Sequence, residues 1–76
     1  LSGMEIREIL ALNMKRHRKA AGPSQEELAH RVGIDRTYVS ALERQVHAAS
    51  VDLLDKLAKA LGIEAAELLR PPDGAA

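Results

Sequence analysis

The apolar residues of this chain recur at intervals of three and four positions, which places them along one face of a helix rather than on alternate faces of a strand. The pattern predicts five helices and no sheet, at about residues 5–21, twice within 25–44, at 51–61 and at 64–69. Each run stops at residues that end helices, because glycine and proline interrupt the helical ladder: Gly22, Pro23, Gly33, Gly62, Pro71 and Pro72. The predicted fold is therefore all-α, a compact five-helix bundle.

The core of such a bundle must come from aliphatic side chains, since Tyr38 is the only aromatic residue among 76. The stripes expected to face inward on the first and fourth helices are Ile6, Ile9, Leu10, Met14 and Ala21, and Val51, Leu54, Leu57, Ala58 and Leu61. A domain of this size has a modest stability margin without a disulfide or a metal, and dimerisation would increase it.

The stretch from Gln25 to Arg44 has the pattern of two short helices joined by a tight turn. Ser24 and Glu27 form an S-x-x-E capping box before the first helix, and Asp35 stands where it can cap the second. Gly33 lies between them, where a left-handed backbone suits glycine. Ala29 is small enough to let the second helix cross closely over the first.

The second of these helices presents a polar front, which points to DNA. Its apolar back consists of Val39 and Leu42, and a short helix of this kind suits a DNA major groove. The residues left off the buried stripe, and so predicted to read bases, are Arg36, Thr37, Tyr38, Ser40 and Ala41. The alternative is an ordinary helical hairpin with a solvated face.

These residues also resemble a known family. SQEELA (Ser24 to Ala29), VGIDRTYVS (Val32 to Ser40), the triplet Leu42-Glu43-Arg44 and LAKALGI (Leu57 to Ile63) are similar to the helix-turn-helix of the Cro and lambda-repressor-like (XRE-type) transcription regulators. IDRTYVS followed by ER is especially similar to the small controller proteins of restriction-modification systems. The resemblance implies a lambda-repressor-like DNA-binding domain over residues 4–70.

The resemblance also implies roles for further residues. Arg18 would pair with Glu43, tying the first helix to the recognition helix, the alternative being an exposed Arg18. Gln25 would meet a phosphate at the start of its helix. Arg44 is a further predicted phosphate contact, as are Lys15 and Lys19 of the basic cluster Lys15-Arg16-His17-Arg18-Lys19. The other interpretation of that cluster is a plain solvated face. Dimers of this family often use their C-terminal helices, where the apolar candidates are Ile63, Leu68 and Leu69, with core packing as the equal alternative.

The formal net charge is zero, but it is unevenly distributed. Residues 15–44 hold seven basic and four acidic groups, whereas residues 45–76 hold three basic and five acidic ones. A protein with one basic and one acidic region can turn its basic face toward phosphates. The loop from Gln45 to Ala49, where the family commonly has basic residues, has no lysine or arginine here.

Several classes of function and site are disfavoured. There is no cysteine, the three histidines are scattered, and no glycine-rich phosphate loop or clustered acid–base set is present, so neither an enzyme, a metal site nor a cofactor is expected. No apolar run is long enough to span a membrane. Residues 1–3 precede Met4 and are interpreted as a cloning remnant, and residues 71–76 as a flexible tail.

The sequence therefore predicts a cytoplasmic, sequence-specific transcription regulator that binds double-stranded DNA. A single short recognition helix reads few base pairs, so a homodimer on a palindromic operator is the expected arrangement. The alternative from another class is a protein-interaction module, such as the antitoxin of a toxin–antitoxin pair, with a protein partner.

Overall fold

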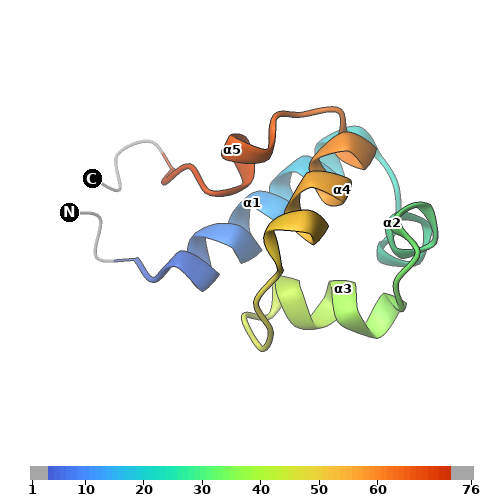
Figure 1. Cartoon of the computed structure of the whole chain (residues 1–76), viewed down its shortest axis with the longest axis horizontal. Coiled ribbons are helices and arrows are strands. Elements are labelled where there is room, and N and C mark those ends of the chain that lie inside the picture. The colour runs from blue at the N-terminus through green and yellow to red at the C-terminus, as the bar shows by residue number, and fades with distance from the viewer. Residues whose placement is uncertain (1–3, 73–76) are drawn as a thin grey trace.

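The computed structural model describes residues 4–72, and within that range the chain forms five helices and no strand. They are α1 (Ile6–Ala21), α2 (Gln25–Val32), α3 (Arg36–Glu43), α4 (Val51–Leu61) and α5 (Ala65–Leu68) (Figure 1). The all-α, five-helix prediction is confirmed. The predicted cloning remnant at residues 1–3 and the tail residues 73–76 lie outside the described residues.

Local capping chemistry sets where most of these helices begin. The Ser24 hydroxyl accepts the Glu27 N–H at 3.0 Å, and the Glu27 carboxylate accepts the Ser24 N–H at 2.9 Å, so the predicted capping box is present. At the start of α4 the Ser50 hydroxyl accepts the Leu53 N–H at 3.1 Å, without a reciprocal bond. Asp35 occupies the N-cap position of α3, but its side chain accepts no cap hydrogen bond.

The core lies where α1 packs against α3, α4 and α5, while α2 packs against α3 and α4. In Figure 1, α3 runs along the lower edge of the molecule and α5 lies on the opposite side, with α1 between them. The fully buried large side chains come from all five helices, so no helix is peripheral to the core: Met14, Leu28, Val39, Leu42, Leu57 and Leu68.

The predicted stripes were wrong at their ends. Ile6 and Val51 are 55% and 81% exposed, and Ala21 is also exposed. Each lies in the first or last turn of its helix, where the helix extends beyond the core that it covers. In their place α1 buries Ala11 and Asn13, which lie further along the helix.

The turn between α2 and α3 is tight because two small residues permit it. Gly33 has a φ of +77°, in the left-handed region that other residues avoid. The N–H of Ile34 donates to the Ala29 carbonyl at 3.0 Å, which closes the end of α2. Ala29 itself is only 2% exposed and belongs to the core cluster, so α2 has no space for a larger side chain at this point.

We predict that Ala29→Leu overpacks this junction and lowers the free energy of unfolding by about 1–3 kcal/mol. The measurement is urea unfolding followed by circular dichroism. Ala20→Leu, at an exposed position near the end of α1, is the matched control and should change stability by less than about 0.5 kcal/mol. Equal stability of the two variants would contradict the close packing at Ala29.

Candidate nucleic-acid interface

A buried carboxylate connects the three helices that form the candidate interface. Glu43, the last residue of α3, has a side chain only 2% exposed. Its two oxygens accept from Arg18 of α1, at 2.7 Å from Nε and 3.1 Å from Nη2, a two-pronged geometry that strengthens the pair. Gln25 of α2 donates its Nε2 to the same carboxylate at 3.1 Å. Arg18 and Glu43, predicted to pair, are thus in direct contact.

The electrostatics of this cluster favour the charged pair. Burial raises the pKa of the Glu43 carboxyl, but the hydrogen bonds from Arg18 and Gln25, with the charges of Arg18 and Lys15, outweigh it and leave that pKa below its ordinary value. The hydrogen bond to Glu43 raises the pKa of Arg18. Arg18 also donates from Nη1 to the Pro23 carbonyl at 3.2 Å. The pair therefore holds α1, the α1–α2 linker and α3 in one arrangement.

The start of α2 presents backbone N–H groups to solvent. The first four N–H groups of a helix have no partner inside the helix. Ser24 accepts those of Glu27 and Leu28, and among residues 4–72 no group accepts those of Gln25 and Glu26. A hollow of about 390 Å³ opens there, lined by Arg18, Ser24, Gln25, Glu26 and Arg36. A helix start beside two guanidinium groups suits an anion such as a phosphate.

Gln25 itself is placed differently from the prediction. Its side-chain amide donates to Glu43, so the side chain is drawn into the buried cluster instead of standing open to a phosphate. The backbone N–H of Gln25 keeps the position at the first turn of α2. The Gln25 side-chain amide thus orients the start of α2, and its backbone N–H is the donor available to an anion.

The first turn of α3 carries the most accessible polar side chains of that helix. Arg36 and Thr37 are both exposed, and within the described part of the chain neither side chain makes a hydrogen bond or ion pair. Arg36 also borders the hollow at the start of α2. An arginine with all its donors available beside a helix start can reach either a phosphate or a guanine edge.

The other three predicted base readers are engaged within the protein. The Tyr38 hydroxyl donates to the Ala48 carbonyl at 3.2 Å, and its ring lies 5.6 Å from that of His47. The Ser40 hydroxyl accepts from Arg44 Nε at 3.2 Å. The prediction for Ala41 was wrong: it is 5% exposed, since the loop after α3 folds back and donates the Val46 N–H to the Ala41 carbonyl at 2.8 Å.

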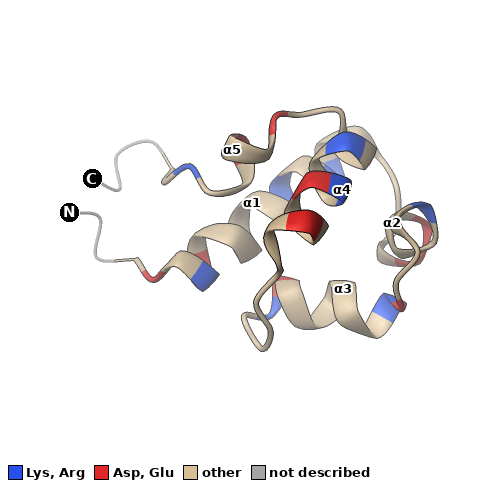
Figure 2. Ribbon diagram, viewed as in Figure 1, with Lys and Arg blue, Asp and Glu red and all other residues tan. Residues whose placement is uncertain are grey.

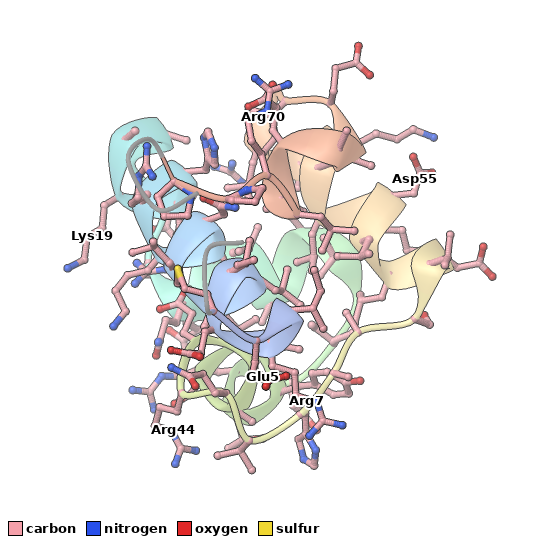
Figure 3. All side chains as sticks on the ribbon, turned by 90° about the vertical axis from the view of Figure 1, so that its left-hand side faces the viewer. Glu5, Arg7, Lys19, Arg44, Asp55 and Arg70 are labelled. Carbon is pink, nitrogen blue, oxygen red and sulfur yellow. The ribbon has the colours of Figure 1, made fainter. Side chains whose placement is uncertain are left out.

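The predicted basic phosphate contacts remain on the surface. Lys15, Lys19 and Arg44 are all exposed. Figure 3 shows Arg44 projecting from the lower side of the molecule, the side on which α3 lies in Figure 1, and Lys19 projecting higher up at the edge. Figure 2 shows that both acidic and basic residues lie on α2 and on α4, so neither helix presents a purely basic face.

The three predicted dimer candidates differ in exposure. Leu68 is fully buried against α1 and α4, so its assignment to a dimer surface was wrong. Ile63 is partly buried and packs against the same core. Leu69 is 36% exposed and lies at the rim of an apolar hollow.

Sequence reasoning missed two further features. Asn13 is buried on the inner face of α1, and a signal for it existed, because it lies four residues after Ile9 on the predicted stripe. The contact of Tyr38 with the loop had no local signal, since it joins residues ten apart through a bend. None of the helices between residues 4 and 72 has the length and hydropathy needed to cross a membrane.

Comparison with known proteins gives consistent matches. Residues 14–68 match the helix-turn-helix family HTH_3. A hypothetical transcription factor from Neisseria meningitidis is 48% identical over 68 residues, covering 90% of this chain but 64% of that protein, so this chain spans less than two thirds of its length. Control protein C.SmaI from Serratia marcescens is 41% identical, covering 87% of this chain and 79% of that one.

Solved structures agree with this grouping. The crystal structure of the hypothetical transcription factor NHTF from Neisseria superposes with a TM-score of 0.86, covering 90% of this chain and 78% of that one at 48% identity. The restriction-modification controller protein C.AhdI from Aeromonas hydrophila gives a TM-score of 0.78 at 40% identity, covering 82% of this chain and 90% of that one. The similarity to controller proteins predicted from the α3 motif is confirmed.

We predict strong coupling between Arg18 and Glu43 in a double-mutant cycle on the free energy of unfolding. Arg18→Met leaves a buried carboxylate unpaired and should destabilise the fold by about 3–5 kcal/mol, whereas adding Glu43→Leu should recover part of that loss. The control cycle is Asp55–Lys59, a pair at 2.9 Å whose side chains are 54% and 77% exposed, with an expected coupling of at most about 1 kcal/mol. Additive losses at Arg18 and Glu43 would show that the pair does not act as a unit.

Proposed function

Because this chain belongs to the helix-turn-helix family HTH_3, and its named relatives are transcription factors and regulators, we propose that it is a sequence-specific DNA-binding regulator that reads a palindromic operator as a homodimer. The observation that carries the proposal is the first turn of α3, where Arg36 and Thr37 are exposed and Arg36 borders the hollow at the start of α2. The names of the relatives favour this function over the antitoxin-type alternative.

Phosphate binding would fix the protein on the duplex. The open N–H groups at the start of α2 and the exposed Arg44 after α3 offer donors at both ends of the helix-turn-helix. Lys15 and Lys19 extend the positive charge along α1. Because the net charge of the chain is zero, these local donors, and not a general attraction, must supply the phosphate affinity.

Base reading would then depend on the first turn of α3. Arg36 offers two parallel donors that match O6 and N7 of guanine, and Thr37 offers a methyl group and a hydroxyl. Tyr38 and Ser40 are hydrogen-bonded within the protein, so we assign them a structural role. Tyr38 holds the loop after α3, and Ser40 holds Arg44. We therefore assign most of the direct specificity to Arg36.

A reading surface this small discriminates few base pairs, which is the reason to propose a homodimer. Two copies related by a two-fold axis double the specific contacts and require a palindromic site. The proposed location is the cytoplasm, because a DNA-binding regulator acts where the chromosome lies.

An exposed apolar face offers a surface for the second copy. Ile6 at the start of α1 and Leu69 after α5 border a hollow of about 220 Å³. The rest of its lining is apolar except for Arg7, and comes from Arg7, Leu10, Ala48, Ala49 and Leu54. Val51 lies one turn before Leu54 on α4 and is 81% exposed. We call Ile6, Val51 and Leu69 with this hollow the apolar end face.

The position of the apolar end face suits a dimer on DNA. It lies at the end of the molecule where α1 begins, and α3 runs with its C-terminal end toward the same side (Figures 1 and 3). A copy docked there would bring the C-terminal ends of the two α3 helices toward the two-fold axis. Their first turns would point outward along the duplex into separate half-sites.

We predict that Arg36→Ala weakens operator binding by about 1–3 kcal/mol per half-site and relaxes the base preference at one position. Selection from random duplexes, with affinities measured at several salt concentrations, checks this. Lys19→Ala is the control and should weaken all sequences alike while reducing the salt dependence. An unchanged selected site for Arg36→Ala, with a reduced salt slope, would assign Arg36 to a phosphate instead.

We predict that Val51→Glu disrupts the homodimer, because it places a charge in an apolar contact. Sedimentation equilibrium should show the dimer dissociation constant rising by about 100-fold, which corresponds to roughly 2.7 kcal/mol. His30→Glu introduces the same new charge at an exposed position of α2 and should leave the dimer unchanged. A dimer that tolerates Val51→Glu would place the interface elsewhere.

A further inference from the structure

Asn13 is the one uncharged polar side chain buried in the described part of the chain, at 3% exposure on the inner face of α1. Its Nδ2 group donates two hydrogen bonds, to the Leu68 carbonyl at 3.0 Å and to the Arg70 carbonyl at 2.8 Å. These bonds join residues 55 and 57 positions apart in the sequence. A buried amide is tolerated only where such bonds replace those to water.

The two carbonyls lie on either side of Leu69. Leu68 ends α5, a helix of four residues, and a helix so short has no independent stability. The last carbonyls of a helix also need partners from outside it. Asn13 supplies partners both at the end of α5 and beyond it, and so holds the backbone before and after Leu69.

Other contacts of this segment are weak. The ion pair between Glu67 and Arg70, at 2.9 Å, has side chains 33% and 64% exposed, and a pair of this kind contributes little. The segment does not close tightly on α1, because a hollow of about 190 Å³ lies between them, lined by residues that include Arg16, His17 and Pro71. The side chain of Leu68 is fully buried and anchors α5. Beyond it, the Asn13 amide donates to the Arg70 carbonyl at 2.8 Å and so holds the backbone that follows.

We propose that Asn13 is a positioning residue for the homodimer: it fixes the backbone around Leu69 so that Leu69 completes the apolar end face beside Ile6. This inference rests on the proposed function, because Leu69 belongs to the surface through which the proposed homodimer forms. Within residues 4–72 the Asn13 side chain hydrogen-bonds Leu68 and Arg70 and no residue of α2 or α3, so the binding of one monomer to one half-site should not depend on it.

Two variants test the role. Asn13→Asp keeps the shape of the side chain but replaces its Nδ2 donor with an oxygen that the Leu68 and Arg70 carbonyls repel. Asn13→Ala removes the two hydrogen bonds without adding that repulsion. The control is Glu67→Gln, which removes the surface ion pair of the same segment. The first measurement is amide hydrogen exchange by NMR in the monomeric Val51→Glu background, and the second is sedimentation equilibrium without Val51→Glu.

We expect the amides of Leu69 and Arg70 to exchange at least about tenfold faster in both Asn13 variants, with α2 and α3 amides within about twofold of the parent. The dimer dissociation constant should rise at least about tenfold, while binding to a single half-site at matched monomer concentration stays within about twofold. Glu67→Gln should change each of these quantities by less than about twofold.

Each contrary result has its own meaning. Faster exchange at Leu69 and Arg70 with an unchanged dimer constant would overturn the positioning role, and uniform acceleration of all amides would reduce Asn13 to general stability. A wild-type protein that stays monomeric overturns the proposed homodimer itself, and the inference with it. The wild-type measurement thus separates failure of the proposed function from failure of the role of Asn13.

Discussion

The arrangement of the candidate interface depends on one buried carboxylate. The Glu43 side chain is almost completely buried. Its charge is tolerated because Arg18 and Gln25 donate hydrogen bonds to its two carboxylate oxygens. A well-packed apolar residue at this position could stabilise the fold as much or more, but it would not select one relative orientation of α1, α2 and α3. Hydrogen bonds are directional, so the network fixes how the start of α2 lies beside the first turn of α3. The spacing between the proposed phosphate contacts and the proposed base-reading side chains follows from that orientation.

The boundaries of the helices could be predicted from the sequence because they depend on local chemistry. Ser24, Glu27 and Ser50 cap with their own side chains, and Gly33 ends α2 because few other residues adopt its backbone angles. The pairing of Arg18 with Glu43 could not come from local rules, and it was reached only through a family resemblance. Burial at Ala41 and Leu68 was misjudged because it depends on where a loop and a short helix fold back, which residue spacing does not encode.

The loop between α3 and α4 connects the recognition helix to the proposed dimer surface. It carries no lysine or arginine from Gln45 to Ala49, which removes phosphate contacts from this part of the chain. The same absence of charge leaves Ala48 and Ala49 free to line the apolar hollow beside Ile6. Tyr38 holds the loop from α3 through the Ala48 carbonyl. The Tyr38 side chain and the backbone bond from Val46 to Ala41 thereby join the recognition helix to the proposed dimer surface.

The proposed function combines a weakly binding monomer with a more strongly binding dimer. With a net charge of zero, one copy gains little from general attraction to DNA, and non-specific binding is correspondingly limited. In the proposed dimer, two copies linked through the apolar end face would double the local contacts, and the second half-site would be bound at a high effective concentration. Occupancy of the operator would therefore rise more steeply than linearly with protein concentration, because the dimer must form before both half-sites are read. A regulator of the proposed kind would respond to its own abundance through the apolar end face, and the residues that hold that face would matter to regulation as much as those proposed to contact the bases.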